Sequence, residues 1–63
     1  MNDLITKILN DKNYLNYRFI KKERRINITY SKDVFELIKI KWYSSENIII
    51  LKDSKKYQLI IFY

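Results

Sequence analysis

The side chains with the clearest chemical potential in this 63-residue sequence are cations that cluster within eight positions. They are Arg18, Lys21, Lys22, Arg24 and Arg25. Such a cluster can neutralise neighbouring phosphates, while aromatic rings close to it can stack on unpaired bases. The rings nearest in sequence are Tyr17, Phe19 and Tyr30. This pattern predicts a surface that contacts RNA or DNA. The alternative is a solvated hairpin end that discourages edge-to-edge pairing of a sheet.

A second candidate binding surface surrounds the single tryptophan. Trp42 and Tyr43 lie beside Lys39 and Lys41 in the sequence. Trp and Tyr are enriched among the residues that dominate binding energy at protein interfaces. The alternative is that Trp42 belongs to the core.

The residue types that usually carry catalysis are missing. The sequence has no His, no Cys and no Gly, whereas acid–base catalysis near neutrality recruits His, covalent catalysis recruits Cys or a Ser with a His partner, and phosphate loops need Gly. Asp33, Glu36 and Lys39 could assemble a metal-dependent nuclease site, but a spacing of three places Glu36 and Lys39 on opposite faces of a strand. We expect a protein that is not an enzyme and that uses no catalytic residue, cofactor or metal ion.

Composition and length limit the partners. The 13 basic and 7 acidic residues give a net charge of +6, which favours a polyanionic partner. Ile, Lys, Asn, Tyr and Phe dominate, and their AT-rich codons indicate a phage or another mobile element of an AT-rich host. The length allows a single domain over residues 1–63. Because a chain this short has a small core and no Cys or His to staple it, association is the remaining common source of stability, and we expect a homodimer.

No apolar stretch is long enough to cross a bilayer, and the first 20 residues lack the pattern of a signal peptide. We therefore expect a protein of the host cytoplasm without a membrane partner.

The hydrophobic periodicity predicts a helix over residues 3–12, then a hairpin of strands 14–20 and 26–30 that turns near residues 22–24. Residues 34–43 fit a strand with Ile38, Ile40 and Trp42 on one face, and this is the interpretation we favour. The alternative is a helix capped at Ser31 that buries Val34, Leu37, Ile38 and Lys41. After a turn at residues 44–47, two apolar runs, 48–51 and 59–62, predict strands joined by the polar loop 53–56. The expected fold is α+β, with one N-terminal helix packed on a four- to five-stranded antiparallel β-meander.

The last two strands carry apolar residues on both faces, as strands covered on both sides do. One ten-residue helix is about 15 Å long and covers only part of one face. A second copy, a host protein or strong sheet curvature must shield the rest. Because the sequence reaches Tyr63 on an apolar strand, that strand is expected to offer an edge for pairing.

The opening Asn2-Asp3-Leu4-Ile5, followed by Ile8, Lys12 and Tyr14, resembles the start of small prophage-encoded anti-CRISPR proteins that inhibit Cas9. The resemblance implies a short helix leading into an antiparallel sheet, and a phage counter-defence function. This chain departs from that family in charge, since those inhibitors are acidic like DNA and this chain is basic, so no functional residue carries over.

The small size, the missing catalytic residues and the surplus apolar sheet face lead us to expect a non-enzymatic inhibitor that contacts a host protein or ribonucleoprotein complex. The alternative is a nucleic-acid-binding module that uses the basic and aromatic hairpin.

Overall fold

The computed structural model describes residues 3–42, 47–53 and 55–63. Two α-helices, a short 3-10 helix and four strands follow one another along the chain. They are α1 (Asp3–Asn10), β1 (Asn16–Ile20), η1 (Lys21–Glu23), β2 (Arg25–Thr29), α2 (Lys32–Trp42), β3 (Ile48–Lys52) and β4 (Tyr57–Phe62). The protein is therefore α+β with a four-stranded antiparallel sheet.

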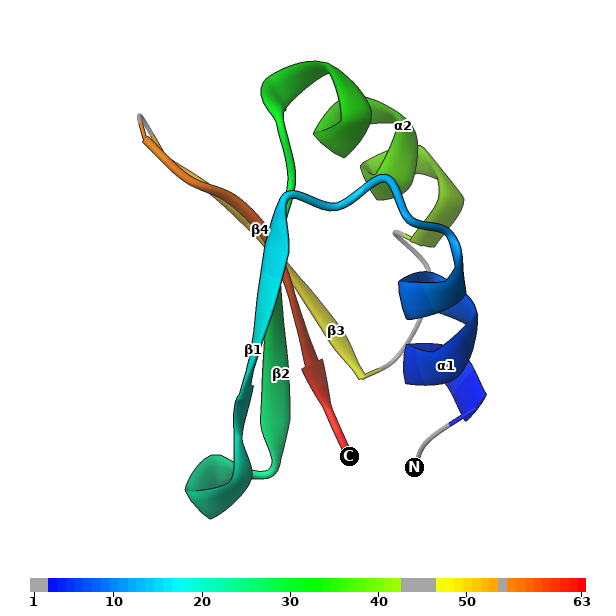
Figure 1. Ribbon diagram of the computed structural model, residues 1–63. Helices are drawn as coiled ribbons and strands as arrows, with labels where there is room; N and C mark the ends of the chain where they lie inside the picture. The colour runs from blue at the N-terminus through cyan, green and yellow to red at the C-terminus, as the bar shows by residue number, and fades with distance from the viewer. Residues whose placement is uncertain (1–2, 43–46, 54) are drawn as a thin grey trace.

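The strands do not form the expected meander. Their order across the sheet is β1-β2-β4-β3, and every neighbouring pair is antiparallel. Helix α2 carries the chain from β2 to the far edge, where β3 runs parallel to β2, and β4 then returns between them (Figure 1). The last strand is thus interior, and the prediction that it offers a free edge is wrong. The two edges are β1 and β3.

The first helix and the hairpin agree with the sequence pattern. Helix α1 ends at Asn10, two residues before the expected end, and buries Ile5 and Ile8. In the hairpin, the register aligns Asn16 with Thr29 and Ile20 with Arg25. The turn between the strands is the 3-10 helix η1, followed by Arg24.

The predicted strand over residues 34–43 is wrong, because Lys32–Trp42 is helix α2. Phe35 and Ile38 are buried and Trp42 packs against the core, which is helical spacing. Ile40, which made the alternation look like a strand, is 67% exposed. The helical alternative is right about Ser31, whose carbonyl accepts the first helical bond from the Phe35 N–H at 2.9 Å.

That alternative is wrong about two of its buried positions, since Leu37 is 70% exposed and Lys41 is also exposed. The predicted turn at residues 44–47 lies outside the described residues except for Asn47.

Both helices lie on the same face of the sheet (Figure 1). The core fills the space between the helices and the sheet. Four of its residues come from the two helices, four from the interior strands and one from the segment between β2 and α2. It consists of Ile5, Ile8, Phe35, Ile38, Ile26, Ile28, Leu59, Ile61 and Tyr30. None of the described helices is long and apolar enough to span a membrane.

Tyr30 is the one core residue with a titratable group. Only 2% of its surface is exposed, and its hydroxyl has no hydrogen-bond partner among the described residues. Burial, together with the nearby Asp11 and Tyr14, raises the pKa of Tyr30 from 10.0 to about 12. The neutral phenol is therefore the form that the folded protein stabilises.

This pKa predicts a loss of stability in strong base. Between pH 10 and 12 the unfolded chain releases the Tyr30 proton while the folded chain retains it, so the free energy of unfolding falls by up to about 1.4 kcal/mol per pH unit. Below pH 10 the contribution is fully present. Urea unfolding of the wild type and of Tyr30→Phe over this range measures the effect. Tyr30→Phe should lose this part of the decline, whereas Tyr17→Phe, at a half-exposed position, should retain it. Equal slopes for the wild type and Tyr30→Phe would contradict the assignment.

Candidate functional site

The sheet face opposite the helices, called here the open face, has no described helix or strand packed against it. Side chains alternate across a strand, so the neighbours of the buried residues in β2 and β4 point to this face. The register of the four strands divides the residues of the open face into an apolar half and a polar half. The apolar half, on β4 and β3, consists of Ile49, Leu51, Ile60 and Phe62. The polar half, mainly on β1 and β2, consists of Asn16, Arg18, Arg25, Asn27, Thr29 and Gln58. The apolar β1 residue Ile20, which pairs with Arg25, also lies on the open face.

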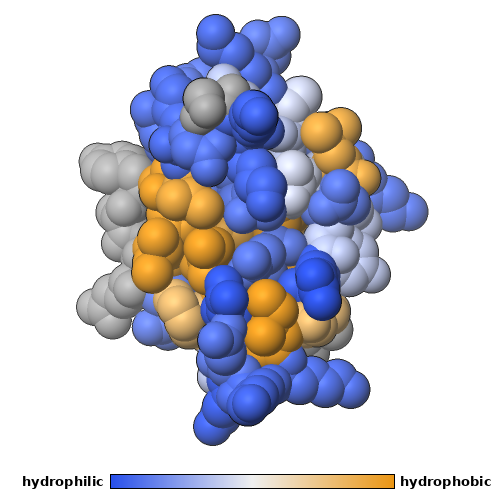
Figure 2. Space-filling model, turned by 90° about the vertical axis from the view of Figure 1, so that its left-hand side faces the viewer, coloured by the Kyte–Doolittle hydropathy of each residue, from blue (hydrophilic) through white to orange (hydrophobic). Residues whose placement is uncertain are grey.

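The apolar half is contiguous and accessible. Ile49 pairs with Ile60 across β3 and β4, and the exposed fractions are 50% for Ile49, 37% for Leu51 and 38% for Phe62. Figure 2 shows the apolar side chains gathered over the β3 and β4 side of this face, with hydrophilic surface beside them. Contiguous apolar surface bordered by polar residues is typical of interaction sites.

The polar half is ordered by its own hydrogen bonds. Arg25 donates from Nε to Glu23 Oε2 at 2.6 Å and from Nη1 to Asn27 Oδ1 at 3.0 Å. Gln58 Nε2 donates to Thr29 Oγ1 at 3.0 Å. Because Arg25 is held by a carboxylate and an amide, its guanidinium is fixed at the border of the apolar half.

The other four cations of the predicted cluster have no carboxylate partner among the described residues. Lys21, Lys22 and Arg24 stand exposed at the hairpin end, called here the basic tip, and Arg18 lies on the adjoining edge strand. The structure therefore brings these cations together as a charged corner of the molecule.

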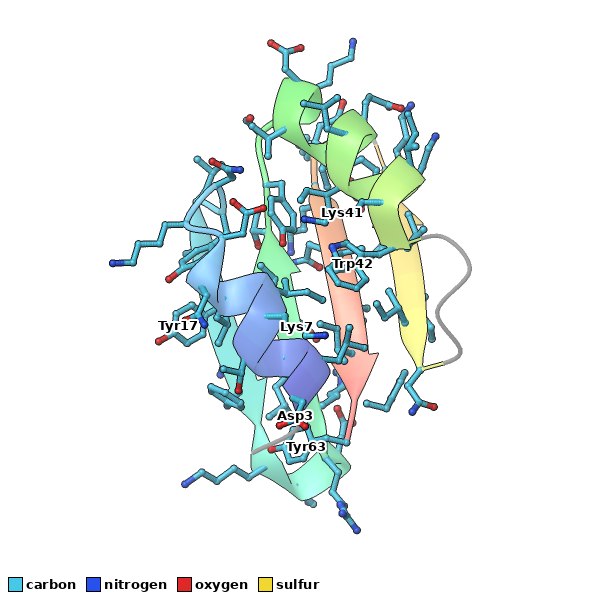
Figure 3. The ribbon with its side chains drawn as sticks, turned by 90° about the vertical axis from the view of Figure 1, so that its right-hand side faces the viewer. Asp3, Lys7, Tyr17, Lys41, Trp42 and Tyr63 are labelled. Atoms are coloured by element: carbon cyan, nitrogen blue, oxygen red, sulfur yellow. The ribbon has the colours of Figure 1, made fainter. Side chains whose placement is uncertain are left out.

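The predicted aromatic partners of this cluster lie elsewhere. Tyr17 is on the helix side of β1, where its ring makes edge-to-face contacts with Tyr14 at 5.4 Å and Phe19 at 5.9 Å between centroids. Figure 3 shows Tyr17 beside α1 at this edge. Arg18 faces the opposite side, and Tyr30 is buried. The prediction that Tyr30 contributes to a stacking surface does not fit this geometry.

The predicted surface around the tryptophan is used within the fold. Trp42 packs against the core, and Lys41 Nζ lies 5.5 Å from the centre of its ring and 3.8 Å from Asp11 Oδ2. Lys41 and Trp42 therefore connect the end of α2 with the segment that follows α1 (Figure 3). Tyr43, the other member of this predicted surface, lies outside the described residues.

Glu36 of α2 forms two ion pairs. Glu36 contacts Lys39 Nζ at 3.3 Å and Lys52 Nζ at 3.2 Å. Hydrogen bonds from Lys52 and Lys39 lower the pKa of Glu36. Within the described residues no three potential metal ligands gather in one place. The arrangement joins α2 to β3.

The residues that the sequence interpretation missed are those of the apolar half, above all Phe62 and Ile60. The apolar runs were recognised, but their faces depend on β4 lying between β2 and β3. Only once α2 is recognised as a crossover does the strand order put Ile60 beside both Asn27 and Ile49.

Comparisons with known protein families, with curated proteins and with solved structures found no match for this chain. The interpretation of the site therefore depends on its geometry.

The backbone conformation at Arg24, in the basic tip, predicts how replacing this residue by Gly changes stability. Arg24 is the one described residue with positive φ, at φ 52° and ψ 52°, a conformation that costs a non-Gly residue about 1–2 kcal/mol. Arg24→Gly should raise the free energy of unfolding by about 0.5–1 kcal/mol, since part of that gain is offset by the greater entropy of unfolded Gly. Chemical denaturation measures it. Lys22→Gly, at a position without positive φ, is the matched control and should destabilise. A destabilised Arg24→Gly would show that the Arg24 side chain stabilises the turn.

Proposed function

We propose that this chain is a non-enzymatic binding protein of a phage or other mobile element, which inhibits a host defence complex of the CRISPR-effector class by protein–protein contact through the open face. The observation that carries the proposal is the apolar half, where Ile49, Leu51 and Phe62 are each more than a third exposed. The similarity of the first residues to anti-CRISPR proteins supports the choice of target class.

The chemistry of the open face defines the partner. Protein interfaces combine an apolar centre with a polar rim, and here the rim on one side is cationic through Arg18, whereas the charge of Arg25 is paired with Glu23. The complementary surface is a protein whose apolar contact region has carboxylates along one border. Such charge complementarity sets orientation and the association rate more than affinity.

A charge placed in the apolar half should weaken inhibition. Phe62→Asp introduces a carboxylate at an exposed position of the interior strand β4, and desolvating it on docking should weaken inhibition at least about tenfold, or about 1.4 kcal/mol. Purified CRISPR effectors are assayed for DNA cleavage with increasing amounts of each protein. Leu37→Asp, on the outward surface of α2, is the matched control and should inhibit as the wild type does. Undiminished inhibition by Phe62→Asp, or inhibition of no effector by the wild type, would refute the proposal.

A second candidate function is direct binding of nucleic acid, and one observation favours it. Arg18, Lys21, Lys22 and Arg24 are exposed and have no carboxylate partner in the described part of the chain. Four unpaired cations at one corner suit phosphate contacts. The separation of Tyr17 from Arg18 and the burial of Tyr30 leave base stacking without support, so this binding would depend on charge.

Salt dependence tests this second function. If the basic tip contacts phosphates, log K for a labelled single strand or duplex falls linearly with log salt, and Lys22→Gln flattens the slope by about one. Lys55→Gln removes an equal charge in the β3–β4 connection, at the opposite end of the sheet (Figure 1). It should leave the slope unchanged. Equal effects of the two substitutions would indicate non-specific attraction by net charge, and no binding at low salt would exclude the function.

A further inference from the structure

The two edges of the sheet differ in charge. Edge strand β1 carries Arg18 and continues into the basic tip, so a second strand approaching it meets like charge from any copy of this chain. Edge strand β3 is Ile-Ile-Ile-Leu-Lys, with its single charge, Lys52, at the end and already paired with Glu36. Charged residues are a usual protection of sheet edges against pairing, and β3 lacks them over its first four positions.

The backbone groups of β3 that face outward can be assigned from its bonds to β4. The Phe62 N–H donates to the Asn47 carbonyl and the Asp53 N–H donates to the Lys56 carbonyl, both at 3.0 Å. In an antiparallel ladder these bonded positions alternate, so Asn47, Ile49, Leu51 and Asp53 direct their N–H and C=O groups to β4. Ile48, Ile50 and Lys52 direct theirs outward, where no described residue bonds to them.

We propose that β3 pairs with β3 of a second copy of this chain, antiparallel and about a two-fold axis at Ile50. In this register Ile50 lies opposite Ile50 of the second copy, and Ile48 lies opposite Lys52. All three residues have outward backbone groups, so every outward N–H and C=O of the strand gains a partner. The segment is complementary to itself, as a two-fold interface requires.

Charge favours this edge over the other. In the dimer the two β1 strands are seven strand spacings apart, which at about 4.8 Å each is about 34 Å. Charges in solvent are screened within about 8 Å at physiological ionic strength. The two basic tips therefore repel each other little despite a net charge of +6 on each chain. Pairing through β1 would instead bring Arg18 of both copies together.

Pairing also enlarges the open face. Ile49 of one copy lies opposite Leu51 of the other, and both side chains are on the open face, where Ile49 neighbours Ile60 and Leu51 neighbours Gln58. The two apolar halves thus become one continuous surface across the two-fold axis, with cations at its two outer borders. The dimer does not depend on the proposed function, and its test uses positions other than Phe62.

The absence of cysteine from the chain makes a cross-linking test specific. Opposed residues at a position without ladder bonds, such as Ile49 and Leu51 of the second copy, have Cα atoms about 4.5 Å apart, within the range of disulfides of about 4.4–6.8 Å. Ile49 is about 7–8 Å from Ile49 of the second copy, a diagonal pair. Both positions are exposed on the open face, so substitution leaves the core intact.

The experiment mixes Ile49→Cys with Leu51→Cys and oxidises them. The mixture should give a covalent dimer of one chain of each kind, at least about tenfold faster than either variant alone. In either variant alone the two identical cysteines form a diagonal pair, whose Cα atoms are too far apart for a disulfide. Equal cross-linking in the mixture and in the separate variants would overturn the register. Sedimentation of the wild type is the second measurement, and the mass of the sedimenting species should double as the protein concentration rises. A protein that stays monomeric up to a concentration of about 1 mM, which corresponds to a very weak Kd, would overturn the dimer.

Discussion

One constraint shapes this protein: both helices cover the same face of a sheet whose last two strands are apolar on both faces. The core that results is one-sided, with Ile5, Ile8, Phe35 and Ile38 from the helices meeting β2 and β4. Without disulfides or a Cys/His metal site, a chain of this size obtains its stability from that single layer of contacts and is expected to be only marginally stable. Every apolar side chain on the other face is then available to a partner, and burying it there would stabilise the complex and the fold together.

Hydrophobic periodicity in the sequence was sufficient to predict the type of each element that has one clearly buried face. Helix α1, the β1–β2 hairpin and strands β3 and β4 each match the sequence pattern. It failed at α2 because Leu37 and Ile40 are apolar but exposed, and they obscured the spacing of Phe35, Ile38 and Trp42. That error spread to the topology. With a strand in place of α2 a meander follows, whereas a helix can carry the chain across the sheet so that β4 lies inside and β3 at the edge. Tertiary contacts settle such a choice, and a single sequence does not contain them.

The sequence predicted which cations of the candidate site gather together, but not the faces to which its side chains point. The run of cations is evident in the sequence, and the structure does gather them. Their relation to the rings depends on strand parity: Arg18 and Tyr17 are adjacent in sequence and therefore lie on opposite faces. Tyr30 follows β2 directly and turns into the core, where burial raises its pKa to about 12. A composition of cations and aromatics is thus weaker evidence for base stacking than the same residues at spacings of two along one strand.

The distribution of charge over the sheet affects both of its uncovered parts, the open face and the edge of β3. Open-face side chains change from mostly polar on β1 and β2, where Arg18 adds a cation, to apolar on β3, and the hydrogen bonds of Arg25 with Glu23 and Asn27 fix the boundary between the two. This gradient has two physical effects at once. It discourages association at the β1 side, where the tips repel any copy of themselves, and it leaves dehydration of apolar surface as the driving force at the β3 side. A partner that buries the apolar half would contact β3 and β4, and a second copy joined at β3 would present two such surfaces in opposite orientations.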